Sequence, residues 1–328
     1  MTTSLVKMEE SGRWHARNVS YYSGQWKQLK TLLPTFELIN FRVGPDFPPN
    51  PYMQSVVRKP RTAMEHPMPV GVVSNSYPLV QHAEVAEKCF EGIRDAGIDP
   101  APLRCEIGLT EFDEWMNLRI YFPEKYQNKI DAKVGDVMDL RLECFNSVDG
   151  SSRVIILFGW KRLKCSNGMV IVESVVELED IHNEHLSLNP IPNIVKEGLE
   201  QAANDLNRFR TWGRTSVNVD MLAPWVNIDI TKKWGKKAAC RVFHICLDGH
   251  DVEIDDPFAP GEATAKPVRK LAEVPGSVSP VSNLFHVSQA LSWVATRRNN
   301  PEERVEWQRQ VPKLVGGLLS HMTPVNRT

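Results

Sequence analysis

The sequence has no long apolar run. Its 328 residues contain nothing near the roughly 18 to 20 consecutive apolar residues that a membrane-spanning helix needs. The N-terminal residues also lack the apolar stretch of a secretory signal. We therefore expect a cytoplasmic protein that does not associate with membranes.

The common signatures of catalysis are missing as well. There is no Gly-rich phosphate loop ending in Gly-Lys-Ser/Thr, no Gly-x-Ser-x-Gly nucleophile elbow and no Gly-x-Gly-x-x-Gly turn after a predicted strand. These absences do not exclude an enzyme, but they leave no residue to name as a nucleophile. We expect no cofactor.

Paired cysteines are also absent. The six cysteines are scattered and form no Cys-x-x-Cys motif: Cys89, Cys105, Cys144, Cys165, Cys240 and Cys246. Most occupy apolar positions of predicted helices or strands, where a thiol behaves as a small hydrophobic group. We expect all six to be reduced and structural, as in a reducing compartment.

A global basic field is lacking, because the net charge is −1. Any affinity for nucleic acid must therefore come from a local patch. Residues 205–241 are the strongest candidate, with eight Lys or Arg, three Asp and a net charge of +5.

The strongest structural pattern is a strand between two turn signals. In the run from Val154 to Trp160, apolar side chains would point to both faces of a strand. This is typical of a strand at the centre of a sheet that is covered on both sides. Asp149-Gly150 and Asn167-Gly168 flank the run and favour tight turns, because these residues tolerate positive φ. We expect two hairpins that share this strand.

Alternating patterns on either side of that strand predict an antiparallel β-meander of about five or more strands. The predicted strands are Leu103 to Leu109, Met116 to Phe122, Met138 to Cys144 and Met169 to Leu178, and Asp139, Arg141 and Glu143 are expected to face solvent. Short strands are also predicted at Phe36 to Val43 and Val70 to Val73.

Helical patterns cover residues 83–96, the segment from Pro192 to Phe209, and Leu284 to Ala295. A strand or turn is expected around Trp225 to Ile230, and a long loop at 256–280. The fold class is therefore α+β: a meander core (66–190) backed by helices, an N-terminal arm (1–65) and a mostly helical C-terminal third (191–328).

The segment from Asn146 to Gly168 contains Asn-Ser-x-Asp-Gly-Ser-Ser, an apolar run, basic residues and Cys-Ser-Asn-Gly. This pattern resembles the uncharacterised plasmid and prophage protein family known as domain of unknown function 932. The resemblance covers most of the chain after about residue 65. It implies a mobile genetic element as the setting and no defined chemistry.

Two polar groups have more than one interpretation. The hydroxyl and amide groups around the two turns (Asn146, Ser147, Ser151, Ser152, Ser166 and Asn167) either serve the turns alone or bind phosphate at a sheet edge. His182 and His185 are spaced as metal ligands would be on a helix. Their segment is predicted to be a loop, so we expect no metal.

Cations alternate with aromatic residues in two stretches of the C-terminal third. The candidate nucleic-acid-binding residues are Arg208, Arg210, Trp212, Arg214, Lys232, Lys233, Trp234, Lys236 and Lys237. Single strands are held by cations on the phosphates and by aromatic rings under the bases. A solvated basic face is the alternative interpretation.

The sequence thus leaves three functions open. The first is a non-enzymatic protein of a mobile element that binds nucleic acid, preferably single-stranded DNA, in recombination, replication or host conflict, and that forms homo-oligomers. The second is a regulatory module that binds another protein of the same element. The third is a metal-dependent enzyme.

Overall fold

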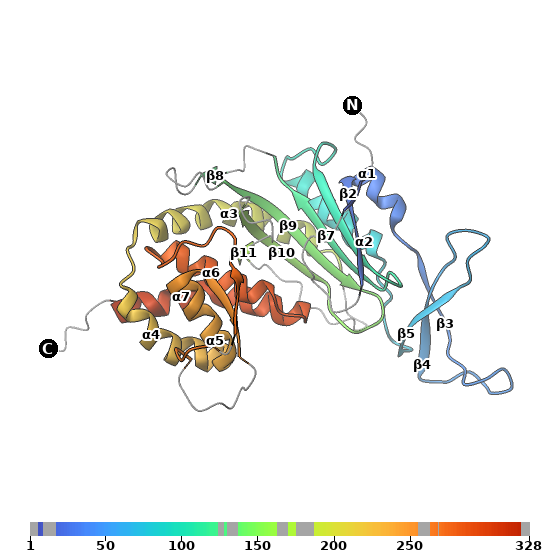
Figure 1. The fold of residues 1–328 in the computed structure, drawn as a ribbon. Coiled ribbons are helices and arrows are strands. Elements are labelled where there is room, and N and C mark those ends of the chain that lie inside the picture. The colour runs from blue at the N-terminus through green and yellow to red at the C-terminus, as the bar shows by residue number, and fades with distance from the viewer. Residues whose placement is uncertain are drawn as a thin grey trace. The chain divides into compact units, whose positions relative to one another are not determined.

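The fold is that of a computed structural model, which describes residues 6–8, 18–123, 128–129, 137–162, 170–174, 187–254, 263–267 and 269–322 (Figure 1). The chain divides into two compact units. The first comprises residues 1–126, 140–159 and 174–202, and the second comprises residues 127–139, 160–173 and 203–328. No helix among the described residues is long and apolar enough to span a membrane.

The largest sheet among the described residues has the strand order β1-β2-β6-β7-β9-β10-β11, and β8 pairs with β9. Its strands are β1 (Val6–Met8), β2 (Val19–Gln25), β6 (Arg104–Thr110), β7 (Trp115–Tyr121), β8 (Asn128–Lys129), β9 (Val137–Ser147), β10 (Ile155–Arg162) and β11 (Val170–Ser174). The pairs from β2 to β9 are antiparallel. The α+β class and the antiparallel meander are therefore confirmed.

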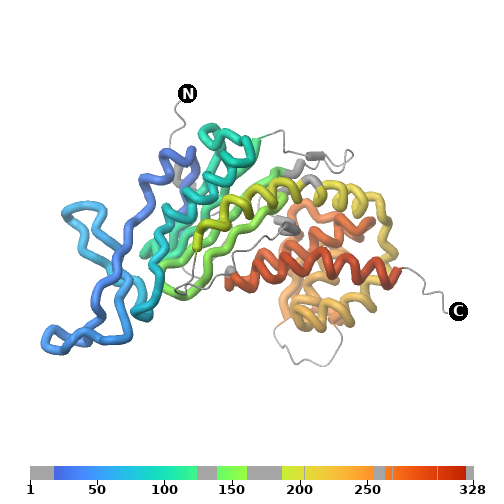
Figure 2. Tube along the Cα trace, turned by 180° about the vertical axis from the view of Figure 1, so that it is seen from behind, coloured from blue at the N-terminus to red at the C-terminus, as the bar shows by residue number. Residues whose placement is uncertain are grey.

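Apolar side chains of neighbouring strands stand in register on one face of this sheet. Ile107 pairs with Leu118, which pairs with Cys144, and all three are fully buried. Helix α2 (His82–Asp95) lies across the sheet in Figure 2 and buries an apolar stripe that includes Phe90 and Ile93. The helix predicted at 83–96 is therefore confirmed. Removal of these side chains from water provides the main stabilisation of the first unit.

Strand β10 confirms the predicted central strand. It lies between β9 and β11, and Val154 to Trp160 are buried on both faces. The preceding turn is wider than predicted, since residues 148–154 separate β9 from β10. Only Gly150 there adopts positive φ, at 78°. Asn167 and Gly168 lie outside the described residues.

A three-stranded antiparallel sheet, β3-β4-β5, completes the β structure of the first unit. Its strands are β3 (Phe36–Asn40), β4 (Met53–Arg58) and β5 (Met68–Ser74). Strands β2 and β4 belong to the segment for which the sequence predicted only one short strand. Helix α1 (Trp26–Leu29) precedes β3, and the Trp26 ring stacks on Phe90.

The second unit is mainly helical. Its helices are the C-terminal part of α3 (Ile191–Arg214), α4 (Leu222–Trp225), a π-helical turn (Val226–Ile230), α5 (Thr231–Asp248), α6 (Leu284–Thr296) and α7 (Pro301–Met322). The predicted strand or turn at Trp225 to Ile230 is wrong, because this segment is helical. Trp225 is fully buried and donates its indole N–H to the Leu314 carbonyl of α7.

The long loop predicted at 256–280 is also partly wrong. Strand β13 (Arg269–Glu273) lies within it and pairs with β12 (His250–Glu253). The helix predicted from Leu284 is confirmed as α6, and the Asn283 side chain caps it by accepting a hydrogen bond from the His286 N–H.

Candidate nucleic-acid interface

Four of the candidate cations surround a break in helix α5. Lys232, Lys233, Lys236 and Lys237 are all exposed, and Gly235 between them has φ 80° and ψ 166°. That conformation is essentially restricted to glycine. A new helical segment therefore starts just after Gly235, with Lys236 and Lys237 in its first turn and Lys232 and Lys233 in the turn before the break.

Three of these lysines form no ion pair within the described part of the chain. Among the described residues, no ion pair involves Lys232, Lys233 or Lys236, and the first turn of α5 contains no acidic residue. The N-terminus of a helix carries a partial positive charge, so cations placed there are destabilising when nothing neutralises them. The break in α5 is thus an electropositive point of the second unit.

Trp234 does not face solvent with the lysines. Its ring is 6% exposed and stacks on Trp307 of α7, with centroids 4.6 Å apart and planes 7° from parallel. Its indole N–H donates to Gln310 Oε1 at 2.8 Å, and the guanidinium of Arg298 lies 4.4 Å from the centre of the Trp307 ring. In this arrangement Trp234 anchors the lysine segment to α7.

The other candidate cations belong to the end of α3. Arg210 and Arg214 are exposed, while Arg208 pairs with Asp205 at 2.7 Å. Trp212 is 8% exposed and lies against Phe209. Among these candidates, Arg208 is half-buried and both Trp212 and Trp234 are buried.

The polar loop between β9 and β10 is hydrogen-bonded internally. The Ser147 hydroxyl donates to the Ser152 carbonyl and accepts from the Ser152 N–H, and the Ser151 N–H and hydroxyl both donate to Asp149 Oδ1. Gly71 of β5 passes so close that a Cβ there would lie 2.8 Å from Asp149 Cα. These polar groups satisfy one another within the loop while β5 packs closely against it, which favours the structural interpretation over phosphate binding.

Asn146 at the start of this loop reaches the N-terminus of α2. Its side-chain amide donates to the Val80 carbonyl and to Nδ1 of the fully buried His82. His82 Nε2 then lies 2.8 Å from the Asp113 carbonyl oxygen. Because Nε2 must donate to this carbonyl, His82 is the neutral Nε2–H tautomer. The motif that carries the family resemblance therefore has a structural role.

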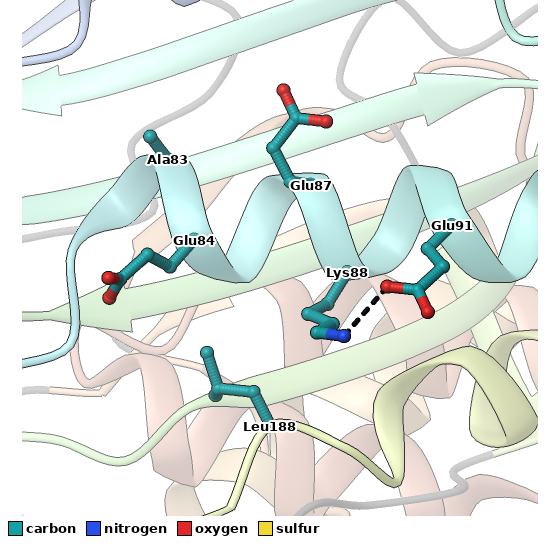
Figure 3. A pocket seen from close by; sticks show the side chains of 6 residues that line it. All are labelled: Ala83, Glu84, Glu87, Lys88, Glu91 and Leu188. Carbon is teal, nitrogen blue, oxygen red and sulfur yellow. Dashed lines mark hydrogen bonds and ion pairs between the residues drawn. The ribbon is translucent and has the colours of Figure 1, made fainter.

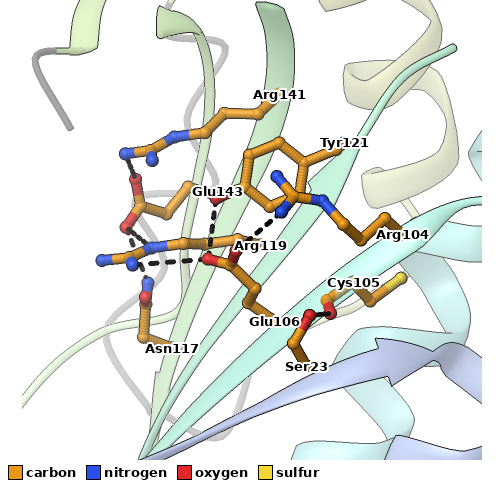
Figure 4. Close-up of polar contacts among 9 residues, drawn as sticks. All are labelled: Ser23, Arg104, Cys105, Glu106, Asn117, Arg119, Tyr121, Arg141 and Glu143. Atoms are coloured by element: carbon orange, nitrogen blue, oxygen red, sulfur yellow. Dashed lines mark hydrogen bonds and ion pairs between the residues drawn. The ribbon is translucent and has the colours of Figure 1, made fainter. Parts of the chain in front are cut away.

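A buried charged cluster (Figure 4) lies on the face of the large sheet opposite Ile107, Leu118 and Cys144, because side chains alternate between the two faces of a strand. Glu106, Arg119 and Glu143 are neighbours across β6, β7 and β9. Arg119 donates to Glu143 at 3.0 Å, and Arg141 does so at 2.6 Å. The expectation that Asp139, Arg141 and Glu143 face solvent is wrong, since they are 8%, 5% and 6% exposed.

The cluster changes the ionisation of its members. Burial alone would raise the pKa of Glu143, but the positive charges of Arg141 and Arg119 outweigh burial and lower it to about 2. Sequence reasoning missed this cluster. The available signal was a set of opposite charges at alternate positions of three consecutive predicted strands.

One pocket of about 450 Å³ lies beside α2 (Figure 3). It is lined by Ala83, Glu84, Glu87, Lys88, Glu91 and Leu188. Glu84 accepts from the Gln81 N–H, Glu87 pairs with Lys30, and Glu91 pairs with Lys88. An acidic wall whose carboxylates already have partners does not suit a phosphate ligand.

The described residues contain no group of three or more side chains that could hold a metal ion. His182 and His185 lie outside the described residues. Asp251, a buried carboxylate of the second unit, accepts hydrogen bonds from Arg241 and from the Trp293 indole. These bonds fix Asp251 as a structural acceptor between α5, β12 and α6.

Comparison with known proteins gives one finding. A search of the curated proteins and a search of the solved structures found no significant match. Residues 69–219 match the family model described as domain of unknown function (DUF932). This range includes α2, the strands from β6 to β11 and α3. The chain therefore contains a DUF932 domain.

Proposed function

We propose that the chain is a non-enzymatic nucleic-acid-binding protein of a mobile genetic element, acting in recombination, replication or host conflict. Single-stranded DNA is the proposed ligand. The observation that carries the proposal is the set of exposed lysines around Gly235: Lys232, Lys233, Lys236 and Lys237.

The break at Gly235 brings four positive charges close together along α5. Lys236 and Lys237 lie in the first turn after Gly235 and oppose the dipole of that helical segment, whereas Lys232 and Lys233 precede the break. A phosphate group bound at this turn would relieve the repulsion and accept hydrogen bonds from backbone N–H groups of the turn. Phosphate contacts by all four lysines would release condensed counterions, which is the main source of sequence-independent affinity.

The two tryptophans that were expected to stack on bases have a different position. Trp212 and Trp234 are buried, so base stacking on them would require both rings to leave their packing partners. We therefore assign the affinity to the lysines, with Arg210 and Arg214 of α3 as additional phosphate contacts. Trp234 holds the lysine segment in place through Trp307 and Gln310.

A binding assay with charge-matched variants tests the proposal. In the first variant the four lysines around Gly235 are replaced by Gln. The control replaces four lysines that already have carboxylate partners, namely Lys30, Lys59, Lys88 and Lys270. Both variants lose the same charge. We expect the first to lose retention on a single-stranded DNA column at low salt and the control to keep most of it. Equal losses would show that only net charge matters.

A further inference from the structure

Exposed apolar side chains concentrate on the three-stranded sheet and its hairpin loops. Of the eleven large hydrophobic residues that are exposed among the described residues, six fall between residues 39 and 72: Ile39, Val43, Phe47, Tyr52, Met64 and Val72. Such a concentration on one small sheet indicates an interaction surface.

One edge of this sheet is the strand β3, which pairs only with β4 among the described strands, and the other edge is β5, whose Gly71 lies against Asp149. The Gln81 side chain donates to the Phe36 carbonyl and accepts from the Phe36 N–H. Both backbone groups of Phe36 therefore point away from β4. Because hydrogen-bonding direction alternates along an antiparallel strand, the backbone groups of Leu38 and Asn40 also point outward.

One face of the sheet carries an exposed apolar side chain on each outer strand. Ile39 of β3 and Val72 of β5 stand on either side of the buried Ser55 of β4. Ile39 is 45% exposed and Val72 is 46% exposed. A further strand added beside β3 would cover Ile39.

Three of the cations around the sheet are neutralised locally, whereas the exposed Arg42 forms no ion pair with any described residue. Lys59 pairs with Glu37 at 3.0 Å, and Arg58 and Arg61 share the Asp113 carboxylate at 2.6 and 2.7 Å. Sequence-independent binding of nucleic acid requires several uncompensated cations, so this surface does not suit it. An occupant that is itself apolar and electrically balanced fits better, and the same surface on a second copy has both properties.

We propose that two copies of this chain join their three-stranded sheets edge to edge through antiparallel pairing of β3. Gln81 blocks pairing at Phe36, so the free backbone groups are those of Leu38 and Asn40. In a symmetric pair, Leu38 of each copy lies opposite Asn40 of the other copy. The two-fold axis therefore passes between the two Ile39 residues. Leu38 then exchanges hydrogen bonds with Asn40 of the partner subunit.

This arrangement has the self-complementarity that a two-fold interface requires. Ile39 faces Ile39 of the partner subunit at a position without backbone hydrogen bonds, where side chains approach most closely. The two Ile39 side chains then cover each other at the axis. The loop after β3 is held by a hydrogen bond from the Asn50 N–H to the Phe41 carbonyl, and it presents Val43 and Phe47 beside the new strand pair.

The first test removes the edge donor. Asn40→Pro deletes an N–H that points away from β4 and leaves the pairing with β4 intact. Asn40→Ala is the matched control, because it removes the side chain and keeps the N–H. By sedimentation velocity over a concentration series, we expect Asn40→Pro to dimerise roughly tenfold or more weakly and Asn40→Ala to resemble the parent.

The second test places charges on the axis. Ile39→Lys and Ile39→Glu each set like charges opposite one another in a homodimer, so each alone should be mainly monomeric. A mixture of the two should recover the dimer, since opposite charges then face each other. A parent that stays monomeric, a dimer that neither substitution weakens, or a mixture without recovery would each overturn the proposal. Circular dichroism melts verify that the variants fold.

Discussion

The rings of Trp234 and Trp307 lie parallel, 4.6 Å between centroids. This contact joins α5 to α7 and places the lysines of α5 on a supported segment. The lysines and Trp234 were expected to bind nucleic acid together. In the structure the lysines face solvent, while the indole between them is buried against α7.

The first prediction follows from this contact. Trp234→Ala removes a stacked, buried ring and leaves a cavity, so it should lower the free energy of unfolding by about 3 to 5 kcal/mol. Thermal denaturation followed by circular dichroism measures the change. Lys233→Ala is the neighbouring control and should have little effect. A Trp234→Ala protein as stable as the parent would mean that the ring is not packed as described.

The second prediction concerns the contact between β5 and the polar loop. Gly71→Ala would place a Cβ 2.8 Å from Asp149 Cα, so we expect a destabilisation of about 1 to 3 kcal/mol. Gly316→Ala is the matched control, because nothing lies within 4 Å of its Cβ position in α7. That variant should gain about 0.5 to 1 kcal/mol. Comparable melting temperatures for the two variants would contradict the close approach.

The third prediction is a pH dependence. The pKa of Glu143 falls from 4.5 to about 2 on folding, so the unfolded chain binds the proton more tightly than the folded chain. The contribution of Glu143 is therefore complete above pH 4.5 and is lost as the pH falls toward 2.

Denaturant titrations at a series of pH values measure this dependence. Glu143→Gln should lower stability at neutral pH by about 3 kcal/mol or more, because Arg119 and Arg141 lose their shared anion. It should also flatten the acid limb of the stability curve. A variant with the same acid limb as the parent would show that other carboxylates dominate.

The fourth prediction concerns the thiols. The five described cysteines are free and buried, and burial raises the pKa of Cys105 and of Cys246 to about 12. A thiol reagent should therefore react slowly with these five in the native protein, because the thiolate is the reactive form. After denaturation without reductant, all six cysteines should react. A reproducible deficit of two would reveal a disulfide.

Most of the fold could be predicted where local pattern and tertiary environment agree. The alternation of Cys105, Ile107 and Leu109 predicted a strand. The helical spacing of apolar residues predicted α2, and α2 buries those same residues. The turn glycine Gly150 was predictable because its positive φ is a purely local requirement.

The failures arise where tertiary contacts override local preference. The segment from Trp225 to Ile230 is rich in β-branched and aromatic residues, which favour strands, yet it is helical because Trp225 packs against α7. Arg141 and Glu143 were expected in solvent, since charged residues are rarely buried unpaired. They are buried because Arg119 of the neighbouring strand completes the cluster, and that pairing becomes visible only when the three predicted strands are compared side by side.

Fluorescence anisotropy with a labelled single-stranded oligonucleotide, titrated at several salt concentrations, tests the central claim most directly. We expect the logarithm of affinity to fall linearly with the logarithm of salt concentration. Each substitution of Lys232, Lys233, Lys236 or Lys237 by Gln should flatten the slope by about 0.7. Substitution of the paired Lys59 should leave it unchanged. If the parent protein shows no binding at about 50 mM salt, it does not bind single-stranded DNA as proposed. If all four lysine variants keep the parent's slope, these lysines do not contact the phosphates.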